Sequence, residues 1–340
     1  MFTRGVGLNV IRILRNITTI AENNSAAVAS SLETLKNKDT ELTGTESLIS
    51  KPQRMEISEI SKILRPGALS SVYVNKSEIL QELVKLGTKL YVIEKEPEAI
   101  KLILSLKFDD IKDTIIFLKD LGIEIEDIGN LITKNPFIFK ENLEDLKVRI
   151  NYLQYKKFTS EMIVRIIRNN PFWLSHSTAD IDNRLGFYQK NFMLSGNEIR
   201  SLTTKCPRLI TFSLDSVKCN IFSLKEEMGF TPEEMKLIIL RRPQLFKSGR
   251  YKLLQTFDYL HNKMKIPLET IVETPEILSC RERRLRERHL FLVKLGKNQY
   301  SPKKPNYIGL KTLISGTDAY FSTEIANSSV QMYNEFLKSL

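Results

Sequence analysis

The densest group of chemically active side chains in this sequence is the run Arg281-Glu-Arg283-Arg284-Leu-Arg286-Glu-Arg288. On a helix, Arg281, Arg284 and Arg288 lie three and four residues apart and share one face. Guanidinium groups neutralise phosphates and bind them through two parallel hydrogen bonds. We therefore expect this face to contact phosphates. The alternative is a solvated face that the two intervening glutamates partly neutralise.

Further basic residues surround this run. Residues 240–311 contain 17 lysines and arginines and 6 acidic residues, an excess of 11 positive charges. This excess equals the formal net charge of the whole chain, +11, because the remaining residues contain 34 basic and 34 acidic side chains. One strongly basic segment indicates a polyanionic partner. The candidate nucleic-acid-binding residues are Arg149, Arg184, Arg241, Arg242, Lys247, Arg250, Lys252, Arg281, Arg284, Arg288, Lys294, Lys297, Lys303 and Lys304.

Aromatic side chains can add base stacking to phosphate contacts. Tyr251, Tyr259 and Tyr300 lie among basic residues and are the stacking candidates. Trp173 occupies a repeated apolar position, where packing in a core is the favoured role.

The sequence contains no constellation that is typical of an enzyme. Its three histidines form no zinc-protease pair, and neither of the usual phosphate-cradling glycine loops occurs. The three cysteines lack the paired spacing of a zinc site or a disulfide framework. We therefore predict a protein without catalytic activity, metal or cofactor.

A short proline-containing motif occurs five times and indicates the helices that position these residues. Pro136, Pro171, Pro207, Pro243 and Pro275 are separated by 35, 36, 36 and 32 residues. Two, three, ten and seventeen residues after each proline the side chain is always apolar or aromatic, although only 42% of the chain is hydrophobic. A fixed period of this size predicts a repeat solenoid. The alternative, unrelated helices that happen to contain proline, leaves this agreement unexplained.

Each repeat is predicted to consist of a helix, a proline turn and a second helix. Ser195 and Thr231 each precede a glutamate by three residues, which is the capping box of a helix start. The next proline ends that helix because it lacks an N–H group and displaces the preceding residue from helical geometry. A short apolar turn of 3₁₀ helix is expected there. Gly122, Gly229 and Gly296 stand where second helices should end.

The thirteenth residue after each proline is arginine in three repeats only. It is Arg149, Arg184 and Arg288 in these, but Asn220 and Thr256 in the other two. Arg149 and Arg184 either lie on the basic face or bridge neighbouring repeats, and the sequence leaves both possibilities open.

The N-terminal residues have a composition of their own. Up to residue 22 the chain is amphipathic, bears arginines and is almost free of acids, a pattern typical of a mitochondrial presequence; an ordinary N-terminal helix is the alternative. No apolar run reaches the roughly 18 residues that a membrane span needs. We predict import into the mitochondrial matrix and the following segments: a presequence (1–22), a flexible linker (23–56), N-terminal helices (57–96), the repeat array with a degenerate first repeat (97–296), and a C-terminal loop with capping helices (297–340).

A proline followed by two large apolar residues, and then by a helix of the type Leu-x-x-Arg-Ile/Leu-x-Tyr/Phe-Leu/Tyr, resembles the mitochondrial transcription termination factor (mTERF) family. Residues 146–153 and 181–188 carry this pattern, and the resemblance covers about residues 77–340. It implies an all-α fold, namely a curved right-handed-type solenoid in the form of a half-ring, built from repeats of about 35 residues. It also implies a basic inner face that binds mitochondrial DNA or ribosomal RNA.

Two classes of function follow from these observations. The first is a monomeric, non-catalytic nucleic-acid-binding regulator. The family resemblance implies that its partners are mitochondrial DNA in the promoter region, large-subunit rRNA and mitochondrial ribosome assembly factors. It also implies that such a protein restrains transcription and supports assembly of the large ribosomal subunit. The second is a protein-binding helical solenoid scaffold in the matrix. Binding that weakens steeply with salt distinguishes the first class from the second.

Overall fold

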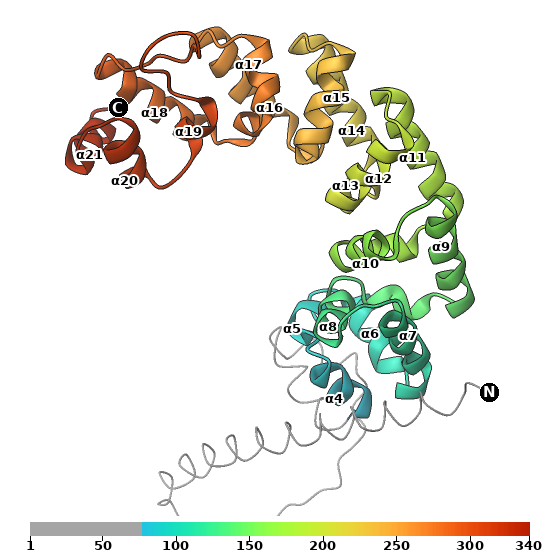
Figure 1. Ribbon diagram of the computed structural model, residues 1–340. Helices are drawn as coiled ribbons and strands as arrows, with labels where there is room; N and C mark the ends of the chain where they lie inside the picture. Colours follow the sequence, from blue (N-terminus) through green and yellow to red (C-terminus); the bar gives the residue numbers. More distant parts are fainter. Residues whose placement is uncertain (1–76) are drawn as a thin grey trace, which may run out of the picture. The chain divides into compact units, whose positions relative to one another are not determined.

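The computed structural model describes residues 77–340 (Figure 1). The predicted presequence, the linker and the first part of the predicted N-terminal helices lie outside this range. Residues 77–340 contain helices and turns but no strand. They divide into two compact units, the first ending at Phe108 and the second running from Asp109 to Leu340.

The described part of the first unit contains three helices: α4 (Glu78–Lys85), α5 (Leu90–Ile93) and α6 (Pro97–Ser105). Ile79 and Leu83 of α4 and Ile103 of α6 are buried, and α6 packs against both other helices. Pro97 begins a nine-residue helix, whereas the five repeated prolines each begin a single turn. α6 thus lies in the same compact unit as α4 and α5, and the bounds of the repeat array, 97–296, stay a prediction.

In the second unit, α7 (Phe108–Asp120) precedes five repeats in which a proline begins a single turn between two longer helices. The turn is 3₁₀ in four repeats, as predicted, and a short α-helix in the third. In chain order the repeats are α8 (Ile125–Lys134), η1 (Pro136–Lys140) and α9 (Leu143–Tyr155); α10 (Ser160–Asn169), η2 (Pro171–Ser175) and α11 (Thr178–Phe192); α12 (Gly196–Lys205), α13 (Pro207–Ile210) and α14 (Leu214–Phe222); α15 (Pro232–Arg241), η4 (Pro243–Lys247) and α16 (Arg250–Asp258); α17 (Leu268–Glu273), η6 (Pro275–Ser279) and α18 (Glu282–Lys294).

The predicted helix boundaries are confirmed by their hydrogen bonds. The hydroxyls of Ser195 and Thr231 accept from the third amide of their helices, and the glutamate at that position accepts from the cap residue, so both capping boxes form. Gly122, Gly229 and Gly296 have φ of +98°, +79° and +66°, a conformation that glycine adopts without steric cost at a helix end.

The repeated apolar positions form the core of the second unit. Nineteen of the twenty are buried, and the exception, Phe139, is half-buried. Trp173 is only 1% exposed, which confirms packing as its role. Burial of one such large side chain contributes roughly 1.5–3 kcal/mol.

Successive repeats stack on one another in chain order (Figure 1). α10 packs against α12, α12 against α15, and α15 against α17, while η1 contacts η2 and α13 contacts η4. Equivalent elements of neighbouring repeats therefore meet, which is the arrangement of a solenoid. Its right-handed, half-ring curvature stays a prediction.

After a loop, the C-terminal segments cover α18. They are α19 (Leu310–Ile314), α20 (Asp318–Tyr320), the π-turn η7 (Phe321–Ile325) and α21 (Val330–Lys338). The ring of Phe291 on α18 lies 4.9 Å from that of Tyr333 and 5.3 Å from that of Phe336, measured between centroids. Within residues 77–340, no helix has both the length and the apolar character of a membrane span.

Candidate nucleic-acid interface

The thirteenth residue after each proline bridges neighbouring repeats. Arg184 on α11 donates from Nη1 to the carbonyl oxygens of Ile210 at 3.0 Å and Phe212 at 2.8 Å, both in the next proline turn. Arg149 on α9 donates to the carbonyl of Leu174 in the same way and pairs with Glu141 at 2.6 Å. Bridging is therefore the role of both arginines, which we remove from the candidate interface.

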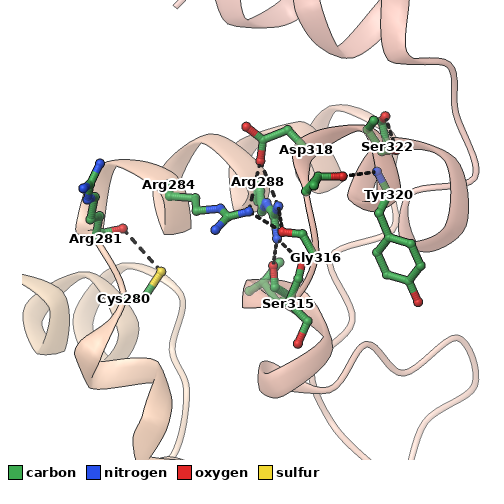
Figure 2. Close-up of polar contacts among 12 residues, drawn as sticks. Cys280, Arg281, Arg284, Arg288, Ser315, Gly316, Asp318, Tyr320 and Ser322 are labelled. Carbon is green, nitrogen blue, oxygen red and sulfur yellow. Dashed lines mark hydrogen bonds and ion pairs between the residues drawn. The ribbon is translucent and has the colours of Figure 1, made fainter. Parts of the chain in front are cut away.

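Arg288 has the same role at the end of the array. Its Nη1 donates to the carbonyls of Leu313 and Ser315, each at 2.8 Å, and its Nη2 lies 2.8 Å from the Asp318 carboxylate (Figure 2). Arg288 is completely buried. The prediction that Arg288 contacts a phosphate is wrong, because the C-terminal segments bury its guanidinium and accept from its Nη1 and Nη2.

Short side chains take this bridging position in the third and fourth repeats. Asn220 donates to the carbonyls of Phe246 at 3.0 Å and Ser248 at 2.9 Å. The Thr256 hydroxyl donates within α16 to the carbonyl of Lys252 at 2.9 Å and lies 3.4 Å from that of Cys280, so its bridge is the weakest of the set. Both side chains are buried. The requirement at this position is thus a hydrogen-bond donor that reaches the next proline turn, and a positive charge is not needed.

Four other candidate residues form contacts within the second unit. Arg241 donates to the carbonyl of Val272 at 2.7 Å, and Lys297 to that of Ala326 at 2.6 Å. Lys294 lies over the Phe336 ring, 5.4 Å from its centroid. The fourth is Arg250, which pairs with Glu227 at 2.5 Å and donates to the Ser223 hydroxyl at 2.8 Å. Arg241, Lys294 and Arg250 nevertheless stay exposed.

Four of the predicted residues gather around Ser279, at the end of the last proline turn. Arg242 Nε lies 3.5 Å from the Ser279 hydroxyl, and Lys252 Nζ lies 3.4 Å from the Ser279 carbonyl. Arg281 is the N-cap of α18 and Arg284 lies in its first turn; Arg281 is directed away from Arg284 (Figure 2). The structure thus brings together cations from the residue between α15 and η4, from α16 and from the start of α18. We call Arg242, Lys252, Arg281 and Arg284 the cation cluster.

A cleft of about 880 Å³ opens beside this cluster. Four arginines line it, and we call it the arginine cleft: Arg242, Arg281, Arg283 and Arg284. Two of them are paired, since Arg283 lies 2.7 Å from Glu287 and Arg284 lies 3.5 Å from Asp318. Arg281 is exposed, and its guanidinium has no hydrogen-bond or ion-pair partner among residues 77–340.

The start of α18 has a cation at its N-cap and no side-chain acceptor for its first amides, and a bound anion would stabilise both. The N-terminus of a helix carries a partial positive charge, which destabilises nearby cations and attracts phosphates. The N-cap residue Arg281 supplies no side-chain acceptor to the first amides, whereas Asn142, Ser177 and Ser213 do so at the corresponding starts of α9, α11 and α14. Phosphate oxygens can serve as the missing acceptors at α18.

The remaining lysines and the tyrosines differ in accessibility. Lys303 and Lys304 are exposed on the loop after α18, and Lys247 is half-buried at the end of η4. Tyr300 is 9% exposed and forms a 2.9 Å hydrogen bond with His289, so the prediction of base stacking by Tyr300 is wrong. Tyr259 is half-buried and packs edge-on against the His289 ring. Tyr251 is 79% exposed and remains a stacking candidate.

Comparison with known proteins agrees with the repeat architecture. Residues 17–229 and 149–322 match the mTERF family. Similar proteins include Transcription termination factor 3, mitochondrial, of Drosophila melanogaster, which is 38% identical over 270 residues (79% of this chain and 76% of the relative). The protein of the same name from Rattus norvegicus is 43% identical over 293 residues (86% and 72%). Transcription termination factor 4, mitochondrial, of Mus musculus is 25% identical over 158 residues (45% of each chain). This chain belongs to the mTERF family.

Proposed function

We propose that this protein is a non-catalytic nucleic-acid-binding regulator of the mitochondrial matrix. It binds mitochondrial DNA in the promoter region and restrains transcription, and it supports assembly of the large ribosomal subunit by binding rRNA. The names of the relatives support mitochondrial transcription as its setting. The observation that carries the proposal is the cation cluster, because it joins basic residues from three elements that lie up to 42 residues apart in the sequence.

The cation cluster suits a phosphate backbone for a physical reason. Each phosphate neutralised by a lysine or arginine releases condensed counterions, and this release dominates sequence-independent affinity. Arg242 and Lys252 have only neutral oxygens as partners, and Arg281 has none among the described residues. These three charges are therefore available to phosphates.

The protein acts as a monomer, and mitochondrial ribosome assembly factors are its expected protein partners.

Cross-linking in intact mitochondria tests the proposal. The wild-type chain should cross-link to promoter-proximal mitochondrial DNA and to large-subunit rRNA. The variant Arg242→Ala/Lys252→Ala/Arg281→Ala should lose most of both signals. A matched control, Lys112→Ala/Lys134→Ala/Lys190→Ala, removes the same charge at exposed positions of α7, α8 and α11 and should keep them.

Two results would count against the proposal. Cross-links to proteins alone would favour a scaffold that binds protein partners. Equal loss of signal in the control variant would show that total charge, and not the cation cluster, determines binding.

A further inference from the structure

We infer that the arginine cleft binds an unpaired stretch of one to three nucleotides and that a nucleic-acid duplex cannot enter it. This inference rests on the proposed nucleic-acid binding and specifies which form of nucleic acid the cleft takes.

The size of the cleft favours a few nucleotides over a duplex. Its volume of about 880 Å³ lies within the ~300–1,000 Å³ range of pockets that enclose small molecules. A pocket of this size encloses a few nucleotides at most. The major groove of B-DNA alone is ~12 Å wide and ~8.5 Å deep, so a whole duplex can only rest against the outside of such a cleft.

The walls of the cleft are chemically mixed. Arg242 and Arg281 provide guanidinium donors, which bind phosphates. Ile314 at the end of α19 and Leu337 near the end of α21 provide apolar surface on the side of the C-terminal segments. An unpaired strand presents both kinds of chemistry, since its phosphates and the faces of its bases are exposed. The outside of a duplex presents mainly phosphates and sugars.

The acidic residues of the cleft also favour an unpaired strand over a duplex. Glu287 is paired with Arg283, and Asp318 with Arg284 and Arg288. The third acid is Glu276, which is half-buried and has no hydrogen-bond or ion-pair partner among residues 77–340. A free carboxylate repels phosphates but accepts hydrogen bonds from base amino groups, such as N4 of cytosine. A duplex presents this amino group only inside its major groove, ~8.5 Å deep, whereas an unpaired base can carry it into the cleft.

The cleft is also rigid on one side. Arg284 and Arg288 both donate to the carbonyl of Gly316, and both pair with Asp318 (Figure 2). These contacts fix the segment that begins α20 against α18. A preformed wall lowers the ordering cost of binding a flexible strand.

Fluorescence anisotropy with the purified full chain tests this inference. The probes are a labelled single-stranded RNA, a single-stranded DNA of the same sequence, and the corresponding blunt duplexes. We expect Arg242→Ala/Arg281→Ala to weaken both forms, because both residues also belong to the cation cluster, and to weaken single-strand binding at least tenfold more than duplex binding. The control Lys303→Ala/Lys304→Ala removes the same charge from the exposed loop and should affect both forms equally. The RNA and DNA arms show whether the bound strand is one, the other or both.

A second variant separates the shape of the cleft from its charge. Leu337→Trp fills the cleft without changing a charge, and far-UV circular dichroism verifies its fold. It should weaken single-strand binding and leave duplex binding unchanged. If the chain binds both forms and neither cleft variant weakens single-strand binding, this inference is overturned while the proposed function stands. If the wild-type chain binds none of the probes, the proposed function fails as well.

Discussion

The guanidinium of Arg288 lies 2.8 Å from the carboxylate of Asp318, in a position that is completely buried between α18 and the C-terminal segments. Its Nη1 and Nη2 also donate to the carbonyls of Leu313, Ser315 and Gly316. Arg288 thus connects the last repeat to its cap as Arg184 connects the second repeat to the third. One sequence position therefore holds each repeat to the segment that follows it.

Replacement of Arg288 should destabilise this end of the array. Arg288→Met keeps the length of the side chain but leaves the carbonyls of Leu313 and Ser315 without their donor and leaves Asp318 with Arg284 alone, at a cost on the order of 3 kcal/mol. Urea denaturation of the full chain measures the change in the free energy of unfolding. Arg283→Met is the matched control, because its side chain is 82% exposed, and it should change stability by less than about 0.5 kcal/mol. Equal effects of the two changes would contradict a bridging role.

Asn220 should be sensitive to the loss of its donor group rather than to a change of size. Asn220→Asp keeps the shape but turns an oxygen toward the carbonyls of Phe246 and Ser248. We expect a loss on the order of 1–3 kcal/mol in thermal or urea unfolding. Asn220→Ala leaves the same carbonyls unpaired without adding a buried charge, and it should be the milder change. An aspartate variant as stable as the wild type would show that these hydrogen bonds contribute little.

The sequence predicted the repeat unit well because its determinants are local. A proline must end a helix, a capping box must begin one, and apolar residues at a fixed spacing must be buried. Ser195, Thr231 and Trp173 behave as these rules require. Most of residues 97–296, which the sequence assigned to the repeat array, are helical for the same reason.

The candidate site was only partly predictable. An arginine on a helix looks the same in the sequence whether it meets a phosphate or a carbonyl of the next repeat. The role of Arg288 depends on Leu313 and Ser315, which lie 25 and 27 residues further along the chain. One signal was present: Asn220 and Thr256 replace arginine at this position, and both are short donors that suit a buried bridge better than a phosphate contact.

Arg250 should become available to nucleic acid when its partner is neutralised. Hydrogen bonds from Ser223 and Arg250 hold the pKa of the Glu227 carboxyl below its usual range, so Glu227 is ionised at neutral pH and competes with phosphates for Arg250. Glu227→Gln should strengthen binding, because it removes the charge that competes with phosphates for Arg250. Anisotropy titration at low salt measures the change. Glu226→Gln is the control on the same turn, because Glu226 pairs with Lys225 instead. Unchanged affinity in Glu227→Gln would exclude Arg250 from the interface.

His289 should make the stability of the C-terminal end dependent on pH. Burial lowers the pKa of His289, which is 9% exposed and bonded to Tyr300. The unfolded chain therefore binds the proton more readily, and the stabilisation is complete above the unfolded pKa of about 6.5 and is lost as pH falls below it. Urea unfolding at pH 7.5 and at lower pH should show a decline in wild type that is smaller in His289→Phe. Parallel declines would show that His289 does not contribute.

The salt dependence of binding tests the central claim most directly. Nucleic-acid affinity is measured by anisotropy over a series of salt concentrations for the wild-type chain, for Arg242→Ala/Lys252→Ala/Arg281→Ala and for the control Lys112→Ala/Lys134→Ala/Lys190→Ala. Because each phosphate contact contributes roughly 0.7–0.9 to the slope of log Kobs against log salt concentration, the first variant should lose about 2–3 of that slope and the control almost none. A slope near zero in the wild type, or the same slope in all three chains, would contradict the assignment of the cation cluster as the nucleic-acid interface.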